Sequence, residues 1–285
     1  MDIEQSRTFL AISAHGSFLG AARQLHITQS TVSARIQRLE EELGARLFVR
    51  NRSGATLTPA GRRFLQHAKR LVLTAEQARH EVGLPNQYRA TLRIGGRIAL
   101  WEGFLLAWVG WMRHTATDVA IRSEIGFEGD LMRQLVEGTL DIGLIYTPSH
   151  SPGLIVEHLF DETLVLVSSR PDDVKPGKDY IYVEWGPGFY DKHAHSYPDL
   201  ERPPQVVNIG WLGLQLILSN GGSCFLPARM VESFIATGSL FRVAETPEYI
   251  HPAYMVYPRE SDNPVLAQAL EGLRQLAKNT PLPEY

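Results

Sequence analysis

Residues 28–38 combine short polar, amide and cationic side chains in one predicted helical segment, TQSTVSARIQR. Short side chains allow the first turn of a helix to enter the DNA major groove, where Gln and Ser hydrogen-bond base edges and Ala contacts a thymine methyl. The amides of a helix N-terminus and threonine hydroxyls suit phosphate oxygens. The candidate DNA contacts in this segment are Thr28, Gln29, Ser30, Thr31, Ser33, Ala34, Arg35, Gln37 and Arg38.

The elements that must position this segment have the order of a helix-turn-helix. Apolar residues at helical spacing predict a first helix over 3–13, ended by Gly16, and a second over 18–25, capped by Ser17. A tight connection then leads to Thr28, the expected N-cap of the third helix. This order places the second of two closely connected helices where it can enter the groove. The residues predicted to face inward on the third helix are Val32, Ile36, Leu39 and Leu43.

A positively charged hairpin is predicted after the third helix. Two short apolar runs, 47–49 and 55–57, bracket the turn-like segment Arg50-Asn51-Arg52-Ser53-Gly54. Together with the three helices, this hairpin forms a winged helix-turn-helix, and Arg50 and Arg52 would reach phosphates or the minor groove. The alternative is a charged hairpin on an unrelated helical domain.

Charge is divided unevenly along the chain. Residues 1–85 hold 12 Lys and Arg against 7 Asp and Glu, a net charge of +5, whereas residues 86–285 hold 16 against 24, or −8. A basic module joined to an acidic one indicates an anionic partner for the first module only. A solvated basic face would have the same composition, so charge alone leaves both interpretations open.

The composition, 44% hydrophobic and 21% charged, is typical of a globular protein, and 285 residues fit two or three domains. No run of about 18 apolar residues predicts a membrane span. The N-terminal sequence Met1-Asp2-Ile3-Glu4 is not a basic-then-apolar signal segment. The single cysteine, Cys224, cannot form an internal disulfide. We therefore expect a cytoplasmic protein.

The first module resembles the LysR-type transcriptional regulators. The resemblance rests on FLAISAHGSFLGAARQLHITQSTVSARIQRLEEELGARLFVRNRSGATLTPAG, residues 9–61, in which many family positions match at fixed spacing. It implies that Gln29 and Ser33 read bases and that Arg50 and Arg52 contact the DNA backbone. Ala34 departs from the family, whose members often have Arg there, so a phosphate contact is absent or is supplied by Arg35.

A long helix is predicted after the hairpin, from Pro59 to Val82, with Thr58 as its N-cap. Its apolar residues form a seam like that of a coiled coil. The resemblance implies that this is a dimerisation helix, with two-fold pairing that places two reading heads on one operator, and that a homotetramer is usual. The alternative is a helix that lies on its own C-terminal domain. The seam consists of Phe64, Leu65, Ala68, Leu71, Val72, Ala75, Ala78 and Val82.

From residue 90 strands and helices alternate. Strands over 91–96, 119–125 and 141–146, with helices over 101–114 and 130–140 between them, predict a parallel sheet. Further strands over 162–169, 180–185, 223–227 and 253–258 predict a second sheet, and a last helix over 264–277 returns to the first. The fold class is therefore α/β, with an N-terminal winged helix-turn-helix and a two-lobed C-terminal domain. The expected domains are residues 1–58, the linker helix 59–85 and the two-lobed domain 90–285, with lobe I at 90–160 and 264–285 and lobe II at 161–263.

Two-lobed folds of this kind bind ligands at the carboxyl ends of parallel strands, between the lobes. The resemblance likewise implies an effector-binding domain similar to periplasmic binding proteins, most clearly at LVEGTLDIGLI (135–145) and GGSCFLPARMV (221–231). The first strand-to-helix turn lacks the Ser or Thr that members often offer to an anionic effector, so Arg97 and Trp101 are expected to take its place. The predicted pocket for an unidentified small-molecule effector consists of Arg97, Ala99, Trp101, Tyr146, Glu184, Trp185 and Gly222. The segments 184–190 and 99–102 resemble the flagellar-regulator-like branch of the family.

Other chemistry-bearing residues are set aside. Asp191, His193 and His195 have a spacing that permits metal binding, but a solvated loop is the preferred interpretation. Cys224 and the pair Trp108 and Trp111 are expected in the core. No P-loop, nucleophile elbow or spaced triad is present, so we expect no enzyme, cofactor or metal. Two alternatives to the regulator are an architectural DNA-binding protein whose second module only oligomerises, and an enzyme or transport-type binding protein with an attached head.

Overall fold

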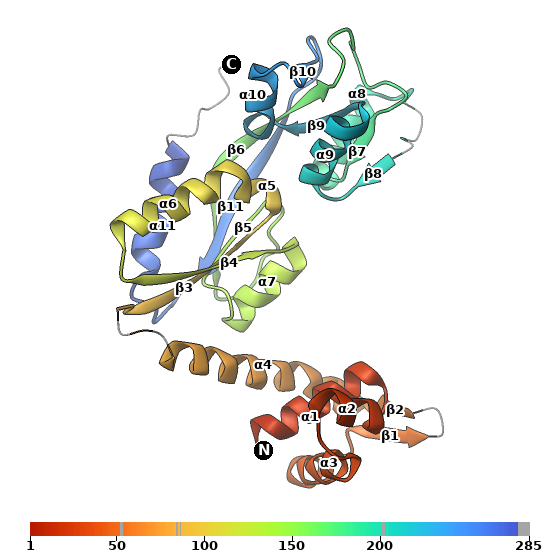
Figure 1. Cartoon of the computed structure of the whole chain (residues 1–285), viewed down its shortest axis with the longest axis vertical. Helices are drawn as coiled ribbons and strands as arrows, with labels where there is room; N and C mark the ends of the chain where they lie inside the picture. The colour runs from red at the N-terminus through yellow and green to blue at the C-terminus, as the bar shows by residue number, and fades with distance from the viewer. Residues whose placement is uncertain (52–53, 84, 86, 201–202, 204, 279–285) are drawn as a thin grey trace. The chain divides into compact units, whose positions relative to one another are not determined.

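The computed structural model describes residues 1–278 except 52, 53, 84, 86, 201, 202 and 204, and it leaves out the side chains of 50, 51, 77, 80 and 81. The chain divides into two compact units, Met1–Pro85 and Asn86–Tyr285 (Figure 1). Within the described residues, no helix combines the length and the apolar character needed to cross a bilayer.

The first unit is a three-helix domain with a hairpin and a long helix, and each predicted cap is present. The side-chain hydroxyls of Ser17, Thr28 and Thr58 accept hydrogen bonds from the backbone amides of Gly20, Thr31 and Gly61 at 3.0, 3.2 and 3.0 Å. These bonds satisfy amide groups that a helix start leaves without a partner. The elements are α1 (Ile3–His15), α2 (Phe18–Leu25), α3 (Gln29–Leu43), β1 (Phe48–Asn51), β2 (Gly54–Leu57) and α4 (Pro59–Val82).

An aromatic cluster holds the first unit together. The Phe9 ring lies 5.1 Å from that of Phe48 and 5.0 Å from that of Phe64, so α1, the hairpin and the start of α4 share one core. Val32, Ile36 and Leu39 of α3 are fully buried in this core, as their spacing predicts. The prediction for Leu43 is wrong, because this side chain is 40% exposed. The chain reverses at the left-handed Gly44, and Leu47 enters the core in its place.

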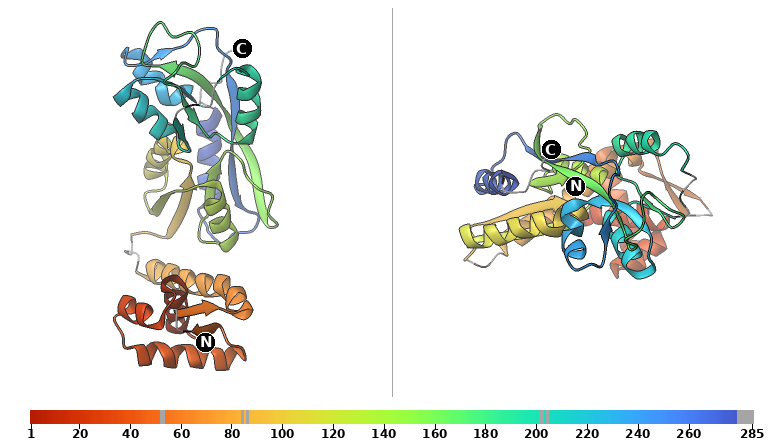
Figure 2. Two further views of the ribbon diagram at one scale, coloured as in Figure 1. Left: turned by 90° about the vertical axis from the view of Figure 1, so that its right-hand side faces the viewer. Right: turned by 90° about the horizontal axis from the view of Figure 1, so that it is seen from above.

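The second unit is an α/β domain in which two long strands run through both lobes, as Figures 1 and 2 show. Its first-lobe elements are β3 (Ala90–Gly96), α5 (Ile98–Leu100), α6 (Leu106–Thr115), β4 (Val119–Ile125), α7 (Glu128–Glu137), β5 (Ile142–Ile145) and α11 (Leu266–Lys278). The long strands are β6 (Leu154–Ser168) and β11 (Tyr249–Pro258). The second-lobe elements are β7 (Ile181–Val183), α8 (Pro187–Ser196), β8 (Gln205–Val207), α9 (Gly210–Asn220), β9 (Ser223–Pro227), α10 (Ala228–Ala236) and β10 (Phe241–Arg242).

The predicted parallel sheet is confirmed, but the predicted second sheet is not a separate one. Strand β3 lies between β4 and β5 and is parallel to both. Strand β11 is antiparallel to β5 and to β6, and β6 in turn pairs with β9 and β10, so the sheet continues into the second lobe. Among the described residues of the second unit, β7 and β8 form a separate two-stranded sheet, and a bridge between Tyr180 and Ser223 links this region to β9. The physical reason is the length of β6 and β11, which lets both strands pair in each lobe.

The predicted helix over 101–114 is broken near its start. Glu102 is extended (ψ 110°) and Gly103 has a φ of 84°, so an irregular turn over Trp101–Leu105 separates α5 from α6. Glycine adopts this positive φ without a steric cost. Arg97 and Ala99, between β3 and this turn, lie at the lobe boundary described below.

Helices α6 and α11 pack against each other in the first lobe. Trp108 is fully buried and its indole N–H donates to the carbonyl of Ala269 at 3.0 Å, while the partly buried ring of Trp111 lies against Gly272. The prediction that both tryptophans belong to the core is confirmed.

Candidate nucleic-acid interface and lobe boundary

The outer face of α3 carries the predicted base-reading side chains. Gln29, Ser30, Ala34, Gln37 and Arg38 are exposed, whereas the opposite face is buried. Helix α3 lies at an edge of the first unit in both ribbon views (Figures 1 and 2). Of the other residues predicted to contact DNA near the first turn, Thr28 is exposed, and Thr31 and Ser33 are half-buried.

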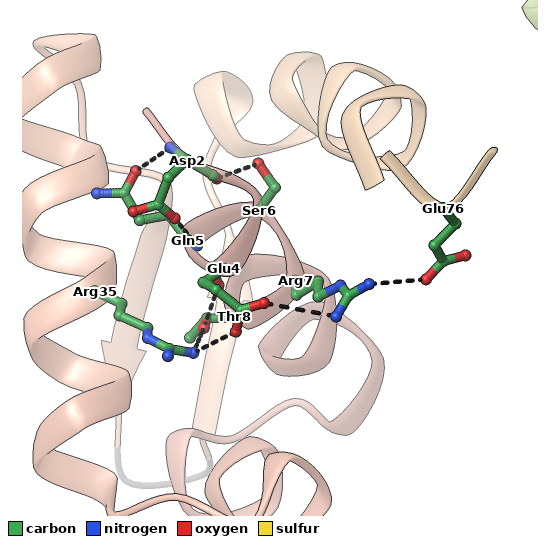
Figure 3. A network of polar contacts seen from close by, with 8 residues as sticks. All are labelled: Asp2, Glu4, Gln5, Ser6, Arg7, Thr8, Arg35 and Glu76. Carbon is green, nitrogen blue, oxygen red and sulfur yellow. Dashed lines mark hydrogen bonds and ion pairs between the residues drawn. The ribbon is translucent and has the colours of Figure 1, made fainter. Parts of the chain in front are cut away.

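Arg35 points away from this outer face and toward α1. Its Nη1 atom lies 3.2 Å from a carboxylate oxygen of Glu4 and donates to the hydroxyl of Thr8 at 3.3 Å. Figure 3 shows that the same α1 segment also binds α4, because Arg7 pairs with Glu4 at 3.5 Å and with Glu76 at 3.2 Å. The network therefore fixes the recognition helix to the long helix through α1, and Arg35 is one of its members.

Glu40 positions the hairpin beside α3, a role that sequence reasoning missed. Its buried carboxylate accepts hydrogen bonds from the backbone amides of Leu47 and Phe48 at 2.7 and 3.3 Å. Gly54, at the start of β2, has a φ of 133°, and a Cβ there would lie 2.3 Å from the carbonyl oxygen of Gly16. The amide of Ala55 donates to that carbonyl at 2.7 Å, so the hairpin is docked at both ends. The signal available in the sequence was the position of Glu40, four residues after Ile36 and so on the inward-facing row of α3.

The tip of the hairpin lies partly outside the described residues. Arg50 belongs to β1, but its side chain is not described, and Arg52 lies outside the described residues. The backbone register of β1 with β2 nevertheless confirms the hairpin, with Phe48 opposite Leu57 and Asn51 opposite Gly54.

Helix α4 divides into two halves along its predicted seam. Phe64 and Ala68 are buried in the core of the first unit. Farther along, Leu71 is 37% and Val82 90% exposed, and Ala78 is exposed as well. The second half of the seam is thus an apolar strip on the surface of the helix.

In the second unit, Arg97 joins the two lobes. Its Nε lies 3.3 Å from a carboxylate oxygen of Glu128, and its Nη2 donates to the carbonyl of Asn208, in the second lobe, at 3.2 Å. The guanidinium carbon lies 4.7 Å from the centre of the Phe127 ring. Its neighbour Trp101 is occupied elsewhere, because the indole N–H donates to the carbonyl of Glu124 at 2.9 Å.

A second arginine, which sequence reasoning missed, lies at the same boundary. Arg229 follows β9 in the second lobe, and its Nη2 contacts a carboxylate oxygen of Glu162 at 2.5 Å and the carbonyl of Ala99, in the first lobe, at 2.9 Å. The hydroxyl of Tyr146 donates to the same oxygen of Glu162 at 3.3 Å. Burial, and then the negative charge of Glu162, holds the pKa of Tyr146 well above its usual value. Arg229 and Tyr146 therefore converge on one buried carboxylate.

Aromatic rings and polar atoms without partners surround this ion pair. The Tyr146 ring lies 4.2 Å from that of His251 and 6.1 Å from that of Trp185. Among the described residues, Nε and Nη1 of Arg229, Oε2 of Glu102 and Nε2 of His251 are buried without a hydrogen-bond partner. Burial raises the pKa of Glu102. For His251, burial and then the positive charges of Arg97 and Lys192 lower the pKa to about 4. Buried polar groups normally find partners, so these atoms mark a place where a ligand or water would be stabilised.

Two members of the predicted pocket lie elsewhere. Glu184 and Trp185 directly follow β7 and continue its alternation, so that Glu184 is exposed and Trp185 is buried. Gly222 precedes β9, and a Cβ on it would lie 2.3 Å from the carbonyl oxygen of Asp179. Since β9 has five residues, this position is about 16 Å from the end of the strand where Arg229 follows. The structure thus brings together Arg97, Ala99, Tyr146 and Trp185, with Trp101 beside them.

The segment with Asp191, His193 and His195 is helix α8, so the predicted solvated loop is wrong. His193 is buried, and its Nε2 shares a hydrogen bond of 2.9 Å with the hydroxyl of Tyr180. The rings of Tyr182, Phe189 and Tyr197 lie 5.3, 5.2 and 5.3 Å from that of His193, and this packing stabilises a helix that composition alone did not indicate. The prediction that Cys224 is buried in a strand is confirmed, and burial raises the pKa of its thiol.

Comparison with known proteins assigns both units. The family described as "Bacterial regulatory helix-turn-helix protein, lysR family" matches residues 3–62, and "LysR substrate binding domain" matches residues 85–278. The chain is 32% identical over 294 residues to the HTH-type transcriptional regulator HdfR of Yersinia enterocolitica, covering 99% of this chain and 97% of that protein. Among solved structures, CbnR, a LysR family transcriptional regulator, is similar with a TM-score of 0.72 at 21% identity, over 97% of this chain and 99% of that one. Full-length CbnR complexed with its target DNA is similar with a TM-score of 0.52 at 22% identity, over 97% and 100%.

The two family models fall on the winged unit and on the two-lobed unit described above, and most of α4 lies between the matched ranges. The chain belongs to the LysR family: it is a DNA-binding transcriptional regulator with a C-terminal effector-binding domain, and not an enzyme.

Proposed function

We propose that this regulator reads DNA sequence through the outer face of α3, and that an effector bound at the lobe boundary changes the geometry of a dimer on its operator. The observation that carries the first half is the composition of that face. Gln29, Ser30, Ala34, Gln37 and Arg38 are exposed together, and no acidic residue occurs between positions 29 and 38. A face of this kind can seat in the major groove with amide and hydroxyl groups against base edges.

Footprinting with purified protein, followed by competition between the protected site and random DNA, tests this half. Replacement Gln29→Ala should lower specific affinity by roughly 1–3 kcal/mol and leave random DNA binding nearly unchanged. Replacement Arg38→Ala should weaken binding to both the specific site and random DNA, and it should flatten the salt dependence of binding, because it removes a positive charge near phosphates. Gln66→Ala, an exposed glutamine on α4, is the matched control and should change neither.

Equal losses on specific and random DNA for Gln29→Ala would contradict the base-reading role. Protection without any preferred site would favour an architectural protein, for which the ratio of specific to non-specific affinity is near one. Arg50 and Arg52 remain proposed backbone contacts of the hairpin, together with Thr28, Thr31 and Ser33 at the helix start. Arg35 is proposed to act through the position of α3, because its guanidinium is bound by Glu4 and Thr8.

We propose homodimerisation through helix 59–82. The exposed apolar strip supports it, since Leu71, Ala75, Ala78 and Val82 recur at helical spacing and the last of them is 90% exposed. A two-fold dimer would place two copies of α3 on half-sites about one turn of DNA apart. A tetramer and a cytoplasmic location are the further expectations from the family.

We propose that the effector site consists of Arg97, Tyr146 and Trp185 of the predicted set, together with Arg229, Glu162 and Glu102. The unpaired atoms of Arg229 and Glu102 support it, because a ligand with an acceptor for the guanidinium and a donor for the carboxylate would satisfy both. The rings of Tyr146 and Trp185 add an apolar wall. Since Arg97 and Arg229 each contact both lobes, a ligand there would shift the population of lobe arrangements and, through it, the spacing of the two reading heads.

Tryptophan fluorescence tests the effector site directly, because all five tryptophans belong to residues 86–285 and Trp185 lies at the boundary. Amino acids, simple carboxylates and amines would be titrated into the full-length protein. Arg229→Met should abolish the response to any ligand that binds, whereas Arg242→Met, which breaks an exposed ion pair with Glu248 in the same lobe, should not. A response that survives Arg229→Met would place the effector elsewhere.

A further inference from the structure

The second lobe contains a cavity of about 660 Å³ that is separate from the lobe boundary. Tyr182 of β7 and Glu184, which directly follows the strand, line it, whereas the alternating residues Val183 and Trp185 are buried in the core. Helix α8 supplies the other wall through Pro187, Tyr190 and Ala194, which recur at helical spacing. The cavity therefore lies on the outer face of β7, and the DNA-binding and effector sites do not use it.

Four aromatic rings form part of the wall, those of Tyr182, Tyr190, His193 and Tyr197. The His193 ring lies 5.3 Å from the rings of both Tyr182 and Tyr197, and all three line the cavity. Tyr190, also in the lining, is 60% exposed, so its ring is accessible to a ligand from solvent. Burial lowers the pKa of His193 to about 4, so this ring is neutral at physiological pH.

Among the described residues, two carboxylates lie near these rings. Glu184 lines the cavity, and Asp191 of α8 lies close enough to Tyr182 that, after burial, both carboxylates raise the pKa of its hydroxyl to about 12. Lys192 projects from the opposite side of α8, about 200° around the helix from Tyr190. None of the described lining residues is Lys or Arg.

We propose that this cavity binds a small organic cation, a protonated or methylated amine. Cations are attracted to the faces of tyrosine rings, and quaternary ammonium groups are the ligands that aromatic cages recognise. Glu184 supplies the opposing charge at the rim. A metal ion fits less well, because groups of three or more potential metal ligands are absent from the described residues. The ligand class follows from the rings and the carboxylate together.

Isothermal titration of the full-length protein with choline and with its neutral isostere 3,3-dimethylbutan-1-ol tests the proposal. Choline should bind one to one, and the isostere, which has the same shape without the charge, should bind at least about tenfold more weakly. Tyr190→Ala and Glu184→Gln should each weaken choline binding by about fivefold to tenfold. Both side chains are exposed, so neither substitution should lower the melting temperature by more than about 2 °C.

Two control variants make the result specific. Glu232→Gln removes an exposed carboxylate from α10 of the same lobe and should leave choline binding unchanged. Arg242→Met, which removes an exposed charge from β10 of the same lobe, should also leave it unchanged; a loss of binding in either control would mean that choline does not depend on the cavity residues and would overturn the proposal. Equal affinity for the isostere, unaltered binding by Tyr190→Ala and Glu184→Gln, or no binding of choline at millimolar concentration would overturn it as well.

Discussion

We predict that His251 makes the stability of the second unit fall at acidic pH, and the variant His251→Phe measures how much of this loss the histidine causes. The ring is buried between Tyr146 and Trp185, 4.2 and 5.6 Å from their centres. Burial first, and then the positive charges of Arg97 and Lys192, lower its pKa to about 4. The unfolded chain binds the proton at about pH 6.5, so between these values the unfolded state holds more protons than the folded one. Stability must therefore fall as the pH falls through this window.

The size of the effect follows from the two pKa values. Linkage gives a loss of about 2 kcal/mol for His251 between about pH 7 and pH 5, and little further loss below about pH 4, where both states are protonated. His193 has a pKa lowered to about 4 by burial and should contribute a similar loss. His251→Phe keeps a ring against Tyr146 but cannot titrate, so the variant should lose about half as much stability as the parent protein.

Urea unfolding of the full-length protein, followed by tryptophan fluorescence at the two pH values, measures this difference. The first unit contains no tryptophan, so the signal reports the second unit alone. His150→Phe, at an exposed position in the same unit, is the control and should retain the full acid-dependent loss. If His251→Phe and the parent protein lose the same stability on acidification, the neutral buried imidazole cannot be the cause, and the reasoning is refuted.

Three further predictions concern stability and assembly. Glu40→Ala should destabilise the hairpin by about 2–4 kcal/mol, seen as faster hydrogen exchange of residues 45–57, because two buried amides lose their acceptor, whereas Glu41→Ala should have little effect. Leu71→Glu should convert the dimer to a monomer in sedimentation velocity, because it introduces charge into the apolar strip, and a persisting dimer would argue against pairing through α4. Glu162→Ala should cost the second unit about 3–5 kcal/mol by leaving Arg229 a buried charge, and a loss below about 1 kcal/mol would show that this pair is not important for stability.

The first unit could be predicted almost completely from the sequence, because its signals are local. Capping hydroxyls at Ser17, Thr28 and Thr58 and the spacing of apolar residues set the helix starts and the buried face. Leu43 was misassigned because periodicity cannot show that the chain reverses at Gly44. The role of Arg35 was also hidden, since its partners Glu4 and Thr8 lie about 30 residues earlier in the chain.

The lobe boundary was only partly predictable, for reasons of strand geometry. Alternation along the predicted strand 180–185 already separates Glu184 from Trp185, so this distinction was available from the sequence. The choice between Gly222 and Arg229 depends on the direction of β9, which the sequence motif alone does not give. Glu162 lies in the middle of a 15-residue strand whose register with β11 contains a shift at Ala253 and Tyr254. The spatial neighbours of a residue that follow from a crossover or a β-bulge cannot be predicted from local sequence patterns.

Arg97 and Arg229 together explain how a ligand could act on the whole domain rather than on one lobe. Each guanidinium contacts a backbone carbonyl of the opposite lobe, that of Asn208 for Arg97 and that of Ala99 for Arg229. Each is also neutralised by a carboxylate of the chain, Glu128 for the first and Glu162 for the second. An acceptor on a ligand can bind the unpaired Nε and Nη1 of Arg229 without breaking either ion pair, and a donor on the same ligand can bind the unpaired Oε2 of Glu102. The arrangement therefore favours a dipolar effector over a simple carboxylate, because only the former satisfies both sets of unpaired atoms.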